Sequence, residues 1–183
     1  GVELRPDMVA RCEAAARQLH ADGLRFIEGD VRTHDPGPID VMIALHACDT
    51  ATDHAIHLGL RGGAEIILCS PCCHKEVRPQ LMSPQPLRPL LKHGVHLGQQ
   101  AEMLTDTLRA MLLESAGYET QVFEFVSLEH TNKNKMILAV RRPGDIDPGV
   151  RATLLSQIQY IKGFYGVREQ CLERLLLAAP STA

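Results

Sequence analysis

Two clusters of His, Cys, Asp and Pro residues each follow a short apolar segment of the chain. Residues 39–45 and 64–70 are largely apolar; the first segment precedes His-Ala-Cys-Asp-Thr at 46–50, and the second precedes Pro-Cys-Cys-His-Lys at 71–75. Imidazole, thiol and carboxylate groups can transfer protons, act as nucleophiles or bind metal ions. The two clusters are therefore the first candidates for a functional site.

The first cluster offers groups for proton transfer. His46 or Asp49 could orient or deprotonate an incoming hydroxyl or amine. Both residues also have purely structural interpretations. His46 could support the end of the strand through a hydrogen bond, and Asp49, with Thr50 and Asp53, could cap the helix that follows.

The thiols allow three interpretations. A thiolate of Cys48, Cys72 or Cys73 could add covalently to a pyrimidine ring, although the Asp-x-Pro-Cys sequence usual for that chemistry is absent. Zinc could be bound by His46, Cys48, Cys72 or Cys73, and His74, but the spacing is not that of a zinc finger, and we expect no metal. Otherwise residues 71–73 form a rigid, apolar wall of an acceptor pocket.

The elements that position these clusters follow from the apolar pattern. Continuous apolar runs at 39–45 and 64–70 are typical of strands buried on both faces. Residues 50–61 suffice for a crossover helix, so the two strands can lie side by side and parallel. Ligands of open α/β sheets bind at the carboxyl ends of strands, where both clusters lie.

The N-terminal segment carries a nucleotide-binding pattern. Residues 1–4 are expected to end one strand, 6–20 to form a helix and 24–28 to form the next strand. Glu3, at the first strand end, could accept hydrogen bonds from both ribose hydroxyls of a nucleoside. Asp30 could accept from an adenine amine while the Val31 amide donates to the ring. Alternatively, both acids only cap turns.

The remaining pattern completes an α/β domain. A helix is expected at 101–116, followed by strands at 121–128 and 135–140 that form an antiparallel hairpin at the sheet edge. Residues 143–148 are the expected linker to two C-terminal helices, and Tyr160, Phe164 and Tyr165 near the turn between them are expected to pack this helical pair onto the domain. We therefore predict two parts, 1–142 and 143–183, and a Rossmann-like, mainly parallel sheet.

A proline-rich stretch separates the second cluster from the 101–116 helix. Its composition predicts a long loop, which either has a function or is a surface excursion without one. Basic residues of this stretch and of the hairpin could line the rim of the site and attract a phosphate-bearing substrate such as RNA, or could be ordinary solvated charges. These residues are Arg78, Arg88, Lys92, Lys133 and Lys135.

Composition restricts the class of protein. The 183 residues are 45% hydrophobic and 22% charged, which is ordinary for a globular domain. No apolar run approaches the ~20 residues of a membrane helix, so we expect no membrane partner and a cytoplasmic location. The six cysteines are not spaced like a secreted disulfide framework, and the net charge of −3 argues against attraction of nucleic acid to the whole surface.

Several motifs in order resemble class I S-adenosylmethionine-dependent methyltransferases. More narrowly, they resemble the methyltransferase domain shared by uncharacterised methyltransferase-like proteins and the glutathione-transferase-C-terminal-domain-containing protein. The paired His-x-Cys and Cys-Cys-His signatures are also similar to those of a eukaryotic tRNA ribose methyltransferase. The motifs are Gly-Val-Glu-Leu-Arg-Pro-Asp from position 1, Ile-Glu-Gly-Asp-Val from 27, Leu-His-Ala-Cys-Asp-Thr from 45, Ser-Pro-Cys-Cys-His-Lys-Glu from 70 and Glu-His-Thr-Asn-Lys-Asn-Lys from 129.

The resemblance implies a fold, a cofactor and a site. The fold is a seven-stranded sheet whose first strand ends in a Gly-rich loop. This sequence contains no G-x-G and begins at the equivalent of the second strand, so the first strand is apparently missing and we expect a fragment of a longer protein. The implied S-adenosylmethionine-binding residues are Glu3, Leu4, Asp30, Val31, Ala44, Leu45 and His46. The implied catalytic candidates are His46, Asp49, Cys72, Cys73 and His74.

Two functions from different classes follow. The first is methyl transfer from S-adenosylmethionine to RNA or protein. The second is a noncatalytic binding or scaffold module that keeps the methyltransferase fold, with a Cys/His zinc site as an option. The sequence does not define the oligomeric state.

Overall fold

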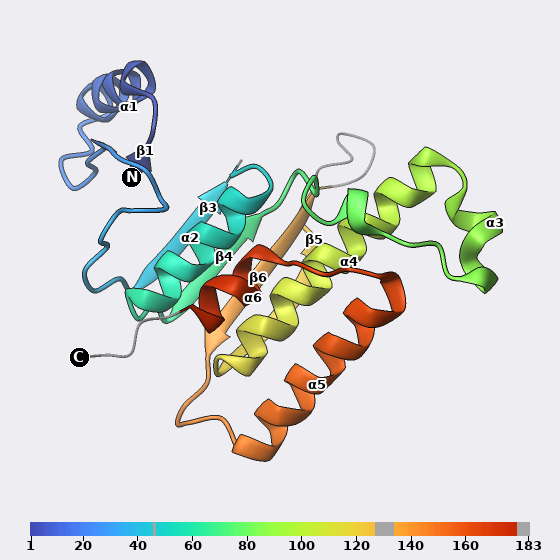
Figure 1. The fold of residues 1–183 in the computed structure, drawn as a ribbon. Helices are drawn as coiled ribbons and strands as arrows, with labels where there is room; N and C mark the ends of the chain where they lie inside the picture. Colours follow the sequence, from blue (N-terminus) through green and yellow to red (C-terminus); the bar gives the residue numbers. More distant parts are fainter. Residues whose placement is uncertain (46, 127–133, 179–183) are drawn as a thin grey trace.

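The computed structural model of the protein describes residues 1–45, 47–126 and 134–178 (Figure 1). The strands are β1 (Val2–Glu3), β2 (Ile27–Glu28), β3 (Val41–Leu45), β4 (Ile66–Ser70), β5 (Tyr118–Glu124) and β6 (Lys135–Arg141). The α-helices are α1 (Pro6–Gln18), α2 (Thr50–Arg61), α3 (Arg88–Leu91), α4 (Gly94–Ser115), α5 (Pro148–Tyr165) and α6 (Cys171–Leu177). Alternation of strands and helices gives the predicted α/β class.

Four strands form a mixed sheet in the order β3-β4-β6-β5. β3 and β4 are parallel, with Leu45 opposite Ser70, whereas β6 is antiparallel to both β4 and β5. β5 is thus the edge strand of an antiparallel hairpin, as predicted. Parallel pairing within this sheet is limited to β3 and β4, so the sheet is mixed rather than mainly parallel.

Helix α2 is the crossover between the two parallel strands, and its ends agree with the predicted range of 50–61. Its apolar residues Ala55, Ile56 and Leu58 are buried. The chain therefore leaves β3, returns along α2 and enters β4 in the same direction. The carboxyl ends of β3 and β4 consequently lie at one edge of the sheet.

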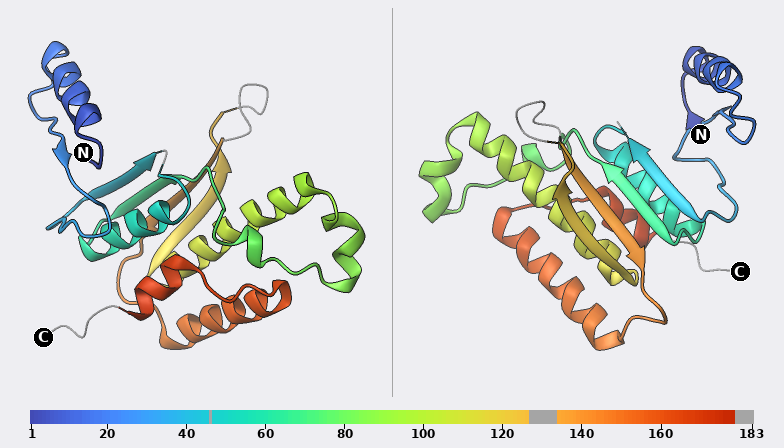
Figure 2. Two further views of the ribbon diagram at one scale, coloured as in Figure 1. Left: turned by 45° about the horizontal axis from the view of Figure 1, so that its top comes forward. Right: turned by 180° about the vertical axis from the view of Figure 1, so that it is seen from behind.

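The helices α2, α4, α5 and α6 lie on one face of the four-stranded sheet, as the two views of Figure 2 show. The prediction that β3 is buried on both faces was therefore wrong. Met42 and Ala44 are buried beneath α2, whereas Ile43 and Leu45 on the other face are 58% and 55% exposed. Side chains alternate along a strand, so covering one face leaves every second apolar residue open.

The N-terminal unit of β1, α1 and β2 stands beside the β3 edge of the larger sheet (Figure 1). β1 and β2 are parallel and pair Glu3 with Glu28 in a separate two-stranded sheet. β2 is shorter than the predicted strand at 24–28, because only Ile27 and Glu28 pair with β1; the amide of Phe26 donates instead to Glu13 Oε1 of α1 at 2.6 Å. Helix α1 ends at Gln18, two residues before its predicted end.

The proline-rich stretch contains short helical turns rather than one long loop. Residues 78–80 and 85–87 form 3₁₀ turns, and α3 follows directly. Each of these turns has a proline in its first positions, where the missing N–H of proline costs no hydrogen bond. α4 begins at Gly94, seven residues before its predicted start at 101, so part of the expected loop is helix.

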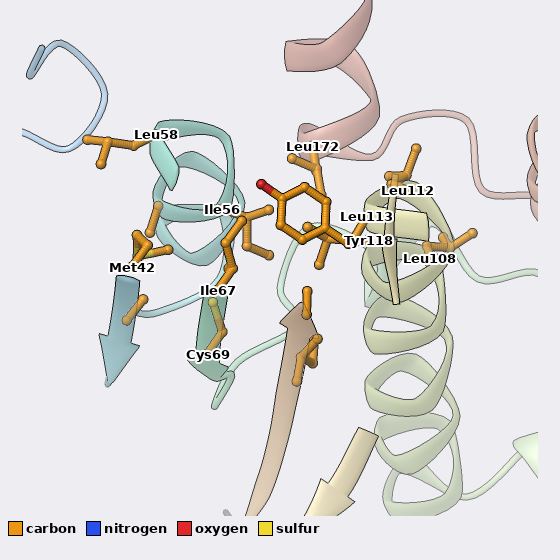
Figure 3. Close-up of a cluster of buried hydrophobic side chains, with 14 of the residues drawn as sticks. Met42, Ile56, Leu58, Ile67, Cys69, Leu108, Leu112, Leu113, Tyr118 and Leu172 are labelled. Carbon is orange, nitrogen blue, oxygen red and sulfur yellow. The ribbon is translucent and has the colours of Figure 1, made fainter. Parts of the chain in front are cut away.

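The core lies between the sheet and its helices (Figure 3). Ile56 of α2, Ile67 of β4 and Leu172 of α6 pack in one cluster with Tyr118, whose hydroxyl donates to the carbonyl of Ala64 at 2.6 Å. Tyr165 packs against this core, but Tyr160 is 78% exposed, so the predicted aromatic packing holds only in part. No helix in the described ranges is long and apolar enough to cross a membrane.

Candidate functional site

A cleft of about 680 Å³ separates the N-terminal unit from β3 and α2. This volume is in the range of small-ligand sites. Six of the seven predicted cofactor-binding residues line the cleft, and the seventh, His46, lies outside the described residues. The six are Glu3, Leu4, Asp30, Val31, Ala44 and Leu45.

Glu3 occupies the carboxyl end of β1, where the chain turns into α1. The amide of Arg5 donates to Glu3 Oε1 at 3.0 Å, and this bond holds the carboxylate at the N-terminal end of α1. A carboxylate has about four lone-pair positions, so Glu3 can still accept from two hydroxyls of a ligand.

Asp30 follows β2 and is held by Arg32. Nε of Arg32 lies 3.0 Å from Oδ1 and 2.9 Å from Oδ2 of Asp30, and the Arg32 amide also donates to Oδ1 at 2.9 Å. Hydrogen bonding to the Arg32 side chain lowers the pKa of Asp30 to about 2. Asp30 is therefore ionised at neutral pH, and a ligand amine would share the carboxylate with Arg32.

His54 is a cleft residue that the sequence analysis missed. It comes from the first turns of α2 and faces the cleft near Asp30 and Arg32. Burial lowers its pKa, so the imidazole is neutral at pH 7 and can accept a hydrogen bond. A histidine one turn after a predicted strand-end cluster was the available signal.

Ala44 and Leu45 contribute to the cleft in different ways. The side chain of Ala44 is buried on the α2 side, whereas Leu45 is 55% exposed on the cleft side. Leu45 and Ile43 thus form an apolar wall of the cleft. Neither side chain carries a charge or a hydrogen-bonding group. Such a wall excludes water from one side of a bound molecule.

Asp49 does not use its side chain to cap α2, although it occupies the N-cap position. Its backbone has a φ of 54°, and its Oδ1 accepts from the amide of Glu76 at 3.0 Å. The capping interpretation is therefore wrong for Asp49. Its carboxylate instead connects the loop after β3 with the loop after β4, and it is not a lining residue of the cleft.

Asp53 also has a different role from the capping interpretation. It is fully buried, and Arg109 of α4 donates to its two oxygens at 3.1 Å and 2.6 Å. Gln170 donates to Asp53 Oδ1 at 2.6 Å, and Arg109 also donates to the carbonyl of Asp49 at 2.9 Å. This buried network, which the sequence analysis missed, fixes the backbone at the strand-end cluster. In the sequence, this network could have been recognised only from Asp53 and Arg109, two charged residues on the apolar faces of the predicted helices.

Cys48, Cys72 and Cys73 come together where β3 and β4 end. The Sγ atoms of Cys48 and Cys72 are 3.3 Å apart, and those of Cys72 and Cys73 are 3.6 Å apart. Burial and the neighbouring thiols raise the pKa of Cys72 to about 12. A cysteine nucleophile needs a lowered pKa, so the raised pKa of Cys72 does not favour covalent attack by this thiol on a pyrimidine.

His74 lies apart from the three thiols. Its side chain is 7% exposed, and its Nε2 is 4.0 Å from Glu102 Oε2 on α4. Glu102 also forms an ion pair with Lys135 at 2.8 Å. His74 thus faces α4, and the structure gives it no place on the cleft lining.

The predicted basic rim is not gathered around the cleft. Arg88 and Lys92 belong to α3 and its C-cap, and α3 lies at the far end of the molecule from β1 (Figure 1). Arg78 donates to the carbonyl of Gly94 at 3.2 Å, and Lys135 is paired as described. Lys133 lies outside the described residues.

Comparison with known proteins places this arrangement in a class. Residues 1–80, which carry both walls of the cleft and both strand-end clusters, match a family described as a methyltransferase domain. The predicted resemblance to methyltransferases is thereby confirmed for this segment. The match is confined to residues 1–80, which include β3, β4 and the strand ends beside the cleft.

Particular relatives are more distant. The chain is 23% identical over 163 residues to the glutathione S-transferase C-terminal domain-containing proteins of Homo sapiens and Macaca fascicularis, and 24% identical to that of Bos taurus. These matches cover 76% of this chain and about a quarter of each relative. Among solved structures, the YcgJ protein from Bacillus subtilis matches with a TM-score of 0.40 and 13% identity, over 79% of this chain and 82% of that one.

Proposed function

We propose that this chain is part of an S-adenosylmethionine-dependent methyltransferase whose cofactor binds in the cleft between the N-terminal unit and β3. The observation that carries the proposal is the meeting of Glu3 and Asp30, from two strand ends, with the apolar wall of β3 in one cleft. Two carboxylates in such positions match the hydroxyl and amine donors of a nucleoside.

The residues of the cleft suit the parts of the cofactor. Glu3 would accept from the ribose hydroxyls, and Asp30 would accept from the adenine amine while the Val31 amide donates to the ring. Leu4 would pack against the nucleoside. The backbone of Ala44, Leu45 and His46 would lie beside the methionyl part.

S-adenosylmethionine supplies an electrophilic methyl group, so the protein needs mainly to align an acceptor and exclude water. Leu45 and Ile43 would keep water from the reacting centre. His46 or Asp49 would orient or deprotonate the acceptor, and the Glu76 amide would hold Asp49 in place. Cys72, Cys73 and His74 would shape the acceptor side.

RNA and protein both remain acceptors in this proposal. A phosphate-bearing acceptor would use basic side chains near the cleft. Arg32 is the basic residue that lines the cleft in the described part of the chain, and Asp30 already neutralises it. A radiolabelled methyl-transfer assay with total RNA and with total protein as acceptors would decide between them.

Isothermal titration with S-adenosylmethionine and its demethylated product tests the proposal. The natural full-length protein that contains this chain should be used, since the chain spans about a quarter of its relatives. Glu3→Gln should weaken binding about 10- to 100-fold, the effect of one or two hydrogen bonds to a charged group. The matched control is Glu28→Gln, because Glu28 pairs with Glu3 across the two-stranded sheet but does not line the cleft.

One observation favours a noncatalytic scaffold as the second candidate. Arg32 donates to both oxygens of Asp30, so a cofactor amine would have to share this carboxylate with an existing ion pair. Absence of binding by the folded full-length protein would support the scaffold and refute the enzyme. Binding that Glu3→Gln weakens and Glu28→Gln does not would refute the scaffold.

A further inference from the structure

The three thiols at the strand-end edge lie in a compact arrangement that methyl transfer does not require. Each of Cys48, Cys72 and Cys73 offers one sulfur atom, and the three atoms all lie within 4.8 Å of one another. Cys48 comes from the loop after β3, and the other two come from the loop after β4. Residues far apart in the chain are thus brought to one point by the parallel pairing of the strands.

The spacing of the sulfur atoms fits a shared metal ion. Zinc binds thiolates at about 2.3 Å, which places two sulfur ligands of a tetrahedral ion about 3.8 Å apart. The observed separations of 3.3 Å and 3.6 Å are close to this value. Small adjustments of the side chains would therefore bring all three sulfurs to bonding distance around one ion.

The backbone under the thiols is firmly held. Asp49 Oδ1 accepts from the Glu76 amide at 3.0 Å, and this bond joins the two loops that carry the cysteines. The buried Arg109 donates to the Asp49 carbonyl at 2.9 Å, which fixes the residue next to Cys48. Pro71, which is buried, restricts the chain just before Cys72. A site on such fixed loops pays little ordering cost when it binds an ion.

The thiols are also accessible, unlike the cysteines of the core. Cys69 and Cys171 are buried, whereas Cys48 is exposed and Cys72 and Cys73 are half-buried. Core packing explains a buried cysteine but not three adjacent thiols open to solvent. Clustered open thiols are prone to oxidation, and coordination by a metal protects them.

We infer that Cys48, Cys72 and Cys73 bind one zinc-class divalent cation as thiolates, with the fourth position open to a further ligand. Soft thiolate ligands select zinc over magnesium or calcium. Cys48 lines the cleft, so the ion would sit at the edge of the proposed cofactor site. His74, which faces Glu102, takes no part in this arrangement.

Cobalt titration of the reduced, chelator-treated natural protein tests the inference. Co²⁺ replaces zinc in tetrahedral sites, and thiolate ligation adds a sulfur-to-cobalt absorption band in the near ultraviolet. The expected result is one equivalent of Co²⁺ with this band, displaced by Zn²⁺. Changing an outer hydrogen-bond partner of a metal ligand typically costs 10- to 100-fold in affinity, so loss of a ligand in Cys48→Ser or Cys73→Ser should cost at least about 100-fold.

Cys12→Ser and Cys69→Ser are the matched controls, because Cys12 lies on α1 and Cys69 is buried in β4. Both should keep the band and the affinity, with circular dichroism showing that each variant is folded. The inference is overturned if the reduced protein binds no stoichiometric cation. It is also overturned if Cys48→Ser and Cys12→Ser bind equally, or if the thiols form only a Cys48–Cys72 disulfide, seen by mass spectrometry. The result does not depend on whether S-adenosylmethionine binds.

Discussion

Substitution of Asp53 tests whether its buried ion pair with Arg109 stabilises the protein and the loops that follow β3 and β4. Asp53 is 0% exposed and Arg109 is 1% exposed, so neither charge can be solvated if the other is removed. Asp53→Asn keeps the shape of the side chain but removes its charge. It also places an amide donor where Arg109 and Gln170 both donate.

The expected loss of unfolding free energy is large. Removing one partner of a buried ion pair typically costs about 3–5 kcal/mol, because the remaining charge is left uncompensated. Asp106 can relieve this only in part, since its Oδ1 is 3.4 Å from Arg109 and burial raises the pKa of Asp106 to about 6. A domain is stable by about 5–15 kcal/mol, so Asp53→Asn should remove about a fifth of the stability or more.

Urea unfolding followed by far-ultraviolet circular dichroism measures this loss. Arg109→Met should cost a similar amount, and the double variant should be more stable than the sum of the two losses predicts, because both charges are then gone. The control is Asp35→Asn at an exposed pair, where Arg61 is 3.7 Å away and a change below about 0.5 kcal/mol is expected. A loss below about 1 kcal/mol in Asp53→Asn, or strict additivity in the double variant, would refute the reasoning.

Three further predictions use single variants. Burial raises the pKa of Asp106 from 3.8 to about 6, so its contribution to stability is present below about pH 4 and is lost as pH rises through 6. Asp106→Asn should therefore make the free energy of unfolding in urea less dependent on pH between 4 and 6, and should raise it by up to about 3 kcal/mol at pH 7. Arg32→Gln should raise the pKa of Asp30 from about 2 toward 3.8 in a carboxyl NMR titration, whereas Arg5→Gln should not. Gly166→Ala should cost about 1–2 kcal/mol in thermal unfolding, because φ is 72° there, whereas Gly163→Ala inside α5 should stabilise by about 0.5–1 kcal/mol. The first prediction fails if Asp106→Asn leaves the pH dependence of stability unchanged, and the second fails if Arg32→Gln leaves the pKa of Asp30 unchanged. The third fails if the two glycine substitutions change stability equally.

The sequence predicted the elements that local pattern determines. The range of α2 was correct, since a polar cluster precedes it and Gly62 follows its last residue. β3, β4 and the β5–β6 hairpin were found from their apolar runs and turns. The meeting of the two clusters followed from one rule, that parallel strands end at the same edge.

What the sequence could not predict depends on contacts between distant residues. β2 pairs with β1 only at Ile27 and Glu28, and the amide of Phe26 donates to Glu13 of α1, a contact that no local sequence pattern predicts. The position of Asp49 before α2 predicted a capping role, but its carboxylate accepts from the amide of Glu76, which lies in the loop after β4. The apolar run of β3 indicated burial on both faces because an apolar side chain at a cleft and one in a core look alike in a sequence.

The core and the strand-end edge are joined by one chain of hydrogen bonds. Arg109 donates to the Asp49 carbonyl, the Asp49 carboxylate accepts from the Glu76 amide, and the Glu76 carboxylate accepts from the Cys171 amide at 3.0 Å. α4 and α6 thereby hold the loops that carry the three thiols. A buried ion pair is weak evidence for stability but can fix one arrangement of the backbone. If it does so here, Arg109→Met should weaken cobalt binding by the thiols even in the fraction of the protein that remains folded, although the hydrogen bonds of Arg109 go to Asp49, Asp53 and Asp106 and not to the three cysteines.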